Sequence, residues 1–214
     1  MIYLASASPR RHELLCQAGI PHQVLEVPSP PGEDEPRFAG ETPQAYVLRT
    51  AREKALRALH WLGQRVESAD AVWPRSDNPA PLRPILTADT TVILGDDVLG
   101  KPQDTVDAAD MLRQLSGRVH HVQTAVVLTV PVENSAFRFH EDVSDTEVVF
   151  KTLTEQEIDS YCASGEPMGK AGAYGIQGRA ATFVARISGS YTGVVGLPLF
   201  ETARLLQKGG VSPL

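Results

Sequence analysis

The chain has 214 residues, of which 42% are hydrophobic, and a formal net charge of -6. This length suffices for one sizeable core. The net negative charge argues against a nucleic-acid polymer as partner, because binding a phosphate backbone normally requires a basic excess, whereas a small phosphorylated ligand needs only a local positive pocket. No run approaches the roughly 18 apolar residues of a membrane span, and no charged leader or apolar signal segment precedes the first strand, so we expect a cytoplasmic protein.

The N-terminal stretch predicts a strand over residues 1–6, a helix over 10–19 and a second strand over 22–27. The turn before this helix contains Ser8, Arg10 and Arg11. Free backbone N–H groups at a helix N-terminus favour an anion, while cations there oppose the helix dipole unless something negative lies between them. The turn therefore predicts an anion site.

Residues 28–40 form a polar, proline-rich and acidic stretch that is too long for a simple turn. The clearest helix follows over 41–63, with Thr42 as a plausible N-cap, Pro43 in the first turn and apolar residues at helical spacing: Tyr46, Ala51, Ala55, Leu59 and Leu62. Residues 66–84 lack periodicity and contain four prolines. We interpret them as a surface excursion within one domain spanning residues 1–214.

The second half alternates strand and helix patterns, ending with helices over 154–165 and 198–210. The sequence predicts a strand over 85–94 that turns back through 98–100, followed by a helix over 105–117. Strands over 119–130 and 136–152 are predicted to form an antiparallel pair, and a last strand covers 181–189. Both βαβ and hairpin connections are present. The fold class is therefore α/β, with a mixed twisted sheet and flanking helices.

Asp89 is the polar residue that this fold explains least, because an unpaired carboxylate within an apolar strand is costly unless it is paired or bound to a metal. Strand alternation places it on the face opposite Ala88 and Thr90. Lys101 follows the next hairpin and can fold back towards it, and Lys54 lies on the long helix. Each of these residues taken singly also has an ordinary structural explanation. Asp89 alone could be a structural aspartate of the strand, and Lys54 alone could be a solvated helix residue.

Other polar features have equally ordinary alternatives. The acidic loop, with Glu33, Asp34 and Glu35, is by itself a solvated loop. Residues 169–178 (GKAGAYGIQG) indicate a loop whose backbone approaches a ligand closely, or an ordinary tight loop, and they lack the spacing of a Walker motif. The Gly/Ser-rich residues 188–198 have the same ambiguity. We expect structural roles for His120 and His121, and two reduced, buried thiols at Cys16 and Cys162, which follow no ligand spacing.

Five stretches taken in order resemble the Maf family of nucleoside triphosphate pyrophosphatases: LASASPRRHELL, GETPQAYVLRTAREKA, TADTTVILGDDVLGKPQD, SGRVHHVQTAVVL and GKAGAYGIQG with ISGSYTGVVGLPLFE. The resemblance spans nearly the whole chain but not residues 66–84. The resemblance implies a fold with two lobes around a cleft, similar to that of inosine triphosphatases, and a cytoplasmic homodimer. It also implies hydrolysis of a nucleoside triphosphate to the monophosphate and pyrophosphate, with a divalent metal, Mg²⁺ or Mn²⁺.

The resemblance also implies roles for individual residues. Ser8, Arg10 and Arg11 would cradle the triphosphate, and Lys54 and Lys101 would neutralise the leaving pyrophosphate. Asp89 would be the general base and, together with Glu35, would hold the metal; Glu33 or Asp34 could replace Glu35. Since a carboxylate is a weak base at neutral pH, Asp89 would serve mostly to orient the attacking water.

Arg10, Thr90 and Gln177 match the dTTP/UTP branch of the family and not the branch acting on methylated guanosine nucleotides. The Gln177 amide can pair with the N3–H and O4 of uracil or thymine, although it could also pair with adenine. Two other classes of function would require different features. A nucleotide kinase would need a complete P-loop, which is absent, and a phosphatase would release orthophosphate. A nucleotide-binding regulator of cell division would bind without turnover.

Overall fold

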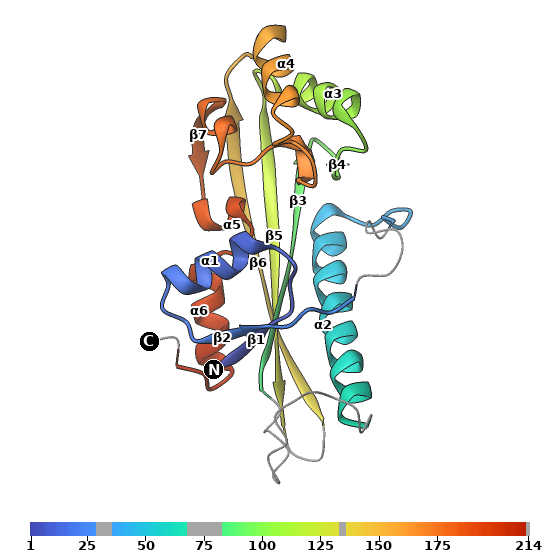
Figure 1. Ribbon diagram of the computed structural model, residues 1–214, viewed down its shortest axis with the longest axis vertical. Helices are drawn as coiled ribbons and strands as arrows, with labels where there is room; N and C mark the ends of the chain where they lie inside the picture. The colour runs from blue at the N-terminus through green and yellow to red at the C-terminus, as the bar shows by residue number, and fades with distance from the viewer. Residues whose placement is uncertain (29–35, 68–82, 133–135, 213–214) are drawn as a thin grey trace.

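The computed structural model describes residues 1–28, 36–67, 83–132 and 136–212. Strands and helices alternate through most of the chain, and two 3₁₀ helices, η1 and η2, lie between α4 and β7 (Figure 1). The elements are β1 (Ile2–Leu4), α1 (Pro9–Gln17), β2 (His22–Val24), α2 (Pro43–Glu67), β3 (Ile85–Leu94), β4 (Asp97–Leu99), α3 (Thr105–Leu115), β5 (Val119–Pro131), β6 (Phe137–Phe150), α4 (Glu155–Ala163), η1 (Ala171–Ala173), η2 (Arg179–Thr182), β7 (Val184–Ser188), α5 (Tyr191–Val195) and α6 (Leu199–Lys208).

The strands form one seven-stranded mixed sheet, in the order β2-β1-β3-β5-β6-β7 with β4 paired to β3. β1 runs parallel to β2 and β3, whereas the other pairs are antiparallel. Helix α2 lies along one side of β3 and β5, while α1, α5 and α6 lie on the other side; α3 and α4 gather at one end (Figure 1). The predicted α/β class with a mixed sheet and flanking helices is confirmed.

Two faces of β3 pack against different partners. On one face, Ala51 and Ala55 of α2 meet Ala125 and Val127 of β5, and these small side chains let the helix approach the sheet closely. On the other face, Leu86 and Ala88 join the largest apolar cluster of the chain. Every residue of β3 is buried except the central pair, Asp89 and Thr90, which are partly exposed. The middle of β3 is therefore the part of this strand that solvent reaches.

Most predicted boundaries hold within a few residues, and the capping box of α4 is present, with Thr154 and Glu157 each bonding the backbone N–H of the other. Two predictions need correction. Helix α2 continues to Glu67, so Val66 and Glu67 belong to the helix, and residues 68–82 lie outside the described part. Residues 188–198 contain a short helix, α5, because the Ser190 hydroxyl accepts a hydrogen bond from the Gly193 N–H at 3.0 Å. Among the described residues, no helix combines the length and the apolar character needed to cross a membrane.

Candidate active site

A cavity of about 1060 Å³ opens beside the middle of β3. Its walls come from the β1–α1 turn, α2, the start of the β4–α3 loop and the segment around η1. All the predicted site residues in the described part of the chain line it, namely Ser8, Arg10, Arg11, Lys54, Asp89, Thr90, Lys101 and Gln177. The predicted Glu35, with its alternatives Glu33 and Asp34, lies outside the described residues.

The Asp89 carboxylate is held by two donors from α2. Thr50 Oγ1 donates to Asp89 Oδ2 at 2.7 Å, and the Lys54 ammonium bonds Oδ1. The two donors lie four positions apart and therefore occupy one face of the helix. The pairing explains how a carboxylate is accommodated in the centre of a sheet, and it fixes the orientation of a group that faces the cavity.

The Arg11 guanidinium ties together three segments that are distant in sequence. Nε donates to the carbonyl oxygen of Gly196 at 2.7 Å, Nη1 to Ser6 Oγ at 3.1 Å and Nη2 to Thr90 Oγ1 at 3.2 Å. Burial lowers the pKa of Arg11 below its ordinary value, and Arg10 lowers it further, while the negative charge of Asp89 opposes both. Three of the five guanidinium N–H donors therefore bond protein oxygens, and these bonds connect the β1–α1 turn to β3 and to the end of α5.

The Thr90 hydroxyl is part of the same arrangement. It bonds Arg11 and lies 2.9 Å from Thr124 Oγ1, which in turn lies 2.8 Å from the Gly193 carbonyl oxygen. The prediction that Asp89 and Thr90 lie on opposite faces of the strand is confirmed, since Asp89 faces α2 while Thr90 faces α1 and α5. The pair thus connects the two sides of the sheet at the cavity.

Positive charge dominates the described lining of the cavity. Six cations face only two carboxylates, Glu26 and Asp89; the cations are Arg10, Arg11, Lys54, Arg57, Lys101 and Lys170. Arg10, unlike Arg11, forms no hydrogen bond or ion pair with any other described residue. The Lys170 ammonium bonds the Glu166 carbonyl oxygen, and its pKa lies below its ordinary value because of burial and the nearby Arg10, despite the opposing charge of Glu166. Such a concentration of cations suits a polyanionic ligand.

Two of the four glycines in residues 169–178 have positive φ, Gly169 (+72°) and Gly172 (+65°), and a Cβ at Gly172 would also lie 2.9 Å from Val92. A Cβ at Gly178 would lie 2.0 Å from Glu166 Oε1, and one at Gly175 would lie 3.0 Å from the aliphatic carbons of Lys170. Glu166 also accepts hydrogen bonds from Tyr161 Oη (3.1 Å) and Arg179 N (3.2 Å). Of the two interpretations of this segment, the glycines themselves therefore support the tight loop, which holds Lys170 at the cavity.

The Gln177 side chain is exposed at the rim of the cavity and forms no hydrogen bond with the described residues. Its backbone is positioned nevertheless, because the Gly178 N–H donates to the Gly175 carbonyl oxygen at 3.0 Å. The amide can thus reach a ligand in either of its two orientations.

Two expectations about titratable side chains have different outcomes. Cys162 is buried, but Cys16 is exposed on the outer side of α1, so the prediction of two buried thiols is wrong for Cys16. His120 is buried as a structural residue: its Nε2 lies 2.8 Å from Tyr174 Oη, and burial together with the neighbouring His121 lowers its pKa to about 4. His121 bonds Asp145 at 2.9 Å.

The sequence interpretation assigned no site role to several residues that the fold places here. Thr50 holds Asp89, Ser6 holds Arg11, and Glu26 and Arg57 line the cavity. One signal was available for Thr50: it lies four positions before Lys54, on the helix face that Lys54 uses. Nothing in the local sequence marks the other three.

The similarity of this chain to known proteins shows which family it belongs to. The family model for Maf-like protein matches residues 1–209. The chain belongs to the Maf family. A Maf relative from Bordetella avium, named dTTP/UTP pyrophosphatase, is 55% identical over 211 residues, covering 99% of this chain and 96% of the relative. Relatives of the same name from Cupriavidus metallidurans and Dechloromonas aromatica are 50% and 43% identical, and each match covers at least 98% of both chains.

Proposed function

We propose that this Maf-family chain hydrolyses dTTP and UTP to the monophosphate and pyrophosphate. The observation that carries the proposal is a cation-rich cavity in which one carboxylate, Asp89, is clamped by Thr50 and Lys54. The names of the relatives, whose matches run the length of the chain, support the same activity. Polyanion binding and an oriented carboxylate are the two elements that this hydrolysis needs.

The triphosphate binds at the N-terminus of α1. Ser8 is the N-cap residue but its side chain makes no capping bond, so its hydroxyl and the free amides of the first turn are available to phosphate oxygens. The Arg10 guanidinium, with its fork of N–H donors, binds the same oxygens. Lys101 and Lys170 line the cavity and add positive charge for the leaving pyrophosphate. Thr90 contributes to the site indirectly, because its hydroxyl accepts a hydrogen bond from Arg11 and so positions the guanidinium in the cavity wall.

Hydrolysis begins when the oxygen of a water molecule attacks the α-phosphorus, and the bond from this phosphorus to the bridging oxygen of the β-phosphate breaks. Asp89 orients this water and accepts its proton. Lys54 and Thr50 hold the carboxylate in place, so that no reorganisation is required as the water attacks. The cations then stabilise the negative charge that develops on the pyrophosphate.

The carboxylates of the cavity fit a hard divalent cation. Asp89 and Glu26 both line it, and carboxylate and phosphate oxygens are the donors that Mg²⁺ and Mn²⁺ prefer. Asp89 would hold the ion together with a carboxylate of the acidic loop, for which we propose Glu35. Such a cation, when bound, neutralises phosphate charge.

Base selection is assigned to Gln177. One amide orientation presents its C=O to the N3–H of uracil or thymine and its NH₂ to O4. Since the side chain has no hydrogen-bond partner among the described residues, the orientation that discriminates against CTP must be fixed when the nucleotide binds.

We further propose that residues 1–214 act as one domain, and that the protein is a cytoplasmic homodimer. The continuous sheet supports the single domain, and the family resemblance supports the homodimer and the cytoplasmic location.

A hydrolysis panel tests the proposal directly. Purified protein is incubated with dTTP, UTP, CTP, ATP, GTP and 7-methyl-GTP in the presence of Mg²⁺ or Mn²⁺, and pyrophosphate and orthophosphate are measured separately. We expect pyrophosphate from dTTP and UTP well ahead of the other nucleotides. Orthophosphate as the first product would indicate a phosphatase, and nucleotide binding without turnover would indicate a regulator; either would refute the proposal.

A further inference from the structure

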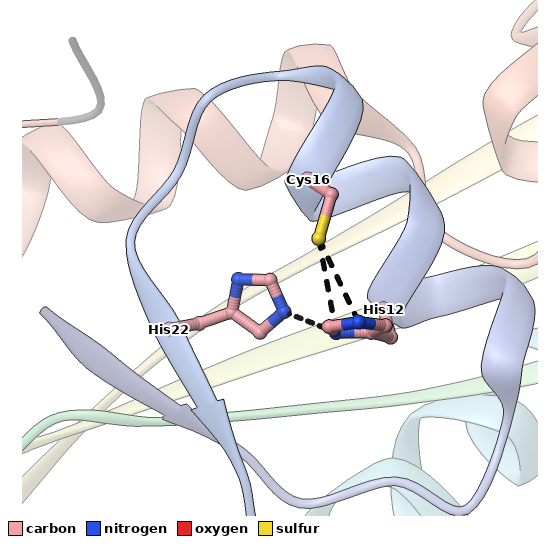
Figure 2. Close-up of side chains that lie close together, drawn as sticks. All are labelled: His12, Cys16 and His22. Carbon is pink, nitrogen blue, oxygen red and sulfur yellow. Dashed lines mark hydrogen bonds between the residues drawn. The ribbon is translucent and has the colours of Figure 1, made fainter.

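Three side chains with metal-ligating atoms meet beside α1, next to the cavity, whose lining includes His12 but neither Cys16 nor His22 (Figure 2). His12 and Cys16 lie one turn apart on α1, and His22 is the first residue of β2. Their ligand atoms all lie within 4.8 Å of one another, and this is the only such cluster of His, Cys, Asp and Glu found among the described residues. His12 and Cys16 are exposed and His22 is half-buried, so solvent reaches the cluster.

The hydrogen bonds of the cluster define where its protons lie. His22 Nδ1 is 2.7 Å from the Ile20 carbonyl oxygen, which can only accept, so Nδ1 carries the proton and the neutral ring has a free lone pair on Nε2. This lone pair accepts a hydrogen bond from His12 Nδ1 at 2.8 Å, which leaves the lone pair of the neutral His12 ring on Nε2. Metal-binding histidines are typically oriented in this way, with the second ring nitrogen donating to a backbone carbonyl.

The spacing of the ligand atoms is close to that of a tetrahedral site. Zn–S and Zn–N bonds of about 2.3 and 2.0–2.1 Å place neighbouring ligand atoms about 3.3–3.6 Å apart. His12 Nε2 lies 3.7 Å from Cys16 Sγ, close to this spacing, whereas the 2.8 Å between His12 Nδ1 and His22 Nε2 is a hydrogen bond that an ion must replace. Since Cys16 Sγ lies at nearly the same distance from both His12 ring nitrogens, the exposed His12 ring must rotate to direct one nitrogen at an ion bound to this sulfur.

We propose that His12, Cys16 and His22 form a binding site for Zn²⁺, with a fourth position open to water or an exchangeable ligand. A thiolate and two imidazoles prefer Zn²⁺ to Mg²⁺, so this site differs in chemistry from the carboxylates of the cavity, which suit Mg²⁺ or Mn²⁺. Binding releases the thiol proton of Cys16 to solvent, and each imidazole keeps one ring proton on the nitrogen that does not bind the ion. The ion then links α1 to β2, which the short segment from Ala18 to Pro21 already joins.

Cobalt provides the spectroscopic test, because a thiolate bound to Co²⁺ gives a charge-transfer band that oxygen and nitrogen ligands do not. The full-length protein is reduced, freed of metal with a chelator and titrated with Co²⁺ in the absence of nucleotide. We expect one equivalent to produce the band and Zn²⁺, but not excess Mg²⁺, to abolish it. At free zinc about 100-fold above its dissociation constant, Tm should rise by roughly 5–10 °C.

The chain supplies matched control variants. Cys16→Ser should lose the band, whereas Cys162→Ala, which alters the only other cysteine, should keep it. His22→Gln should weaken binding of Co²⁺ at least about tenfold, and His140→Gln, on β6 away from the cluster, should not. A band that survives Cys16→Ser, or equal effects of His22→Gln and His140→Gln, would overturn the proposal. Because no nucleotide is present, these outcomes are independent of the proposed hydrolysis.

Discussion

Arg10 and Arg11 are adjacent and chemically identical, yet the structure predicts opposite consequences when each is replaced by alanine. Arg11→Ala removes the three hydrogen bonds to Gly196, Ser6 and Thr90. At about 1 kcal/mol for each bond, the free energy of unfolding should fall by about 3 kcal/mol. For a chain of this size the loss corresponds to a decrease in Tm of roughly 6–12 °C. Arg10→Ala breaks no hydrogen bond with a described residue and should change stability by less than about 0.5 kcal/mol.

Nucleotide binding should show the reverse order. Arg10→Ala should weaken binding of a non-hydrolysable triphosphate by about 1.5–3 kcal/mol, or roughly 10- to 150-fold, because charge-assisted hydrogen bonds to phosphate are lost. The loss should be the same for every base. Arg11→Lys tests geometry against charge: it keeps the positive charge but not the planar fork, and should recover only a minor part of the stability.

Urea unfolding followed by circular dichroism measures the first effect, and isothermal titration calorimetry measures the second. The reasoning is refuted if Arg11→Ala is as stable as wild type, or if it weakens triphosphate binding more than Arg10→Ala does while remaining fully folded. Either result would return Arg11 to the phosphate-binding role that its position in the sequence predicts.

Three further predictions concern catalysis, base selection and pH. Asp89→Asn should fold normally but lose roughly 10²-fold or more in kcat, whereas the exposed Asp97→Asn should be unaffected; near-normal turnover of Asp89→Asn would exclude the assigned role. Gln177→Ala should shrink the ratio of kcat/KM for UTP over CTP, expected to be at least about tenfold in wild type, and an unchanged ratio would show that another group reads the base. The pKa of His120, about 4 when folded, lies below that of an unfolded histidine, so the folded state binds fewer protons and stability falls as pH drops from about 6.5 towards 4. Between pH 7 and pH 5 wild type should lose about 2 kcal/mol more than His120→Gln, as measured by urea unfolding at each pH.

Regular patterns in the sequence were enough to predict most of the fold. The apolar run over 85–94 corresponds to β3 without error, and Thr154 and Glu157 predict the start of α4, because each signal depends only on nearby residues. The end of α2 and the existence of α5 could not be predicted in the same way. Three glycines and two serines in residues 188–198 disfavour a helix, and the helix forms only as a single short turn capped by Ser190.

Polar residues in unexpected places also predicted most of the cavity lining, but not the bonds that organise it. The Thr50–Asp89 bond joins residues 39 positions apart, and the bond from Arg11 to Gly196 joins residues 185 positions apart. Neither can be read from local spacing, since both depend on how a helix packs against the sheet. For the same reason the three hydrogen bonds of Arg11 could not be predicted, and Cys16 is exposed although the sequence predicts that it is buried, because its exposure depends on which face of α1 is covered.

The middle of β3 explains how one cavity can combine a cationic surface with an oriented carboxylate. Consecutive strand residues point to opposite faces, so Asp89 and Thr90 contact different helices although they are adjacent. Asp89 bonds α2 through Thr50 and Lys54, and Thr90 bonds α1 through Arg11. Two polar residues in the centre of a sheet would otherwise be costly, but here each is satisfied by a helix that also lines the cavity. The hydrogen bonds that stabilise Asp89 and Thr90 within the strand are therefore the same bonds that fix α2 and α1 on either side of the cavity.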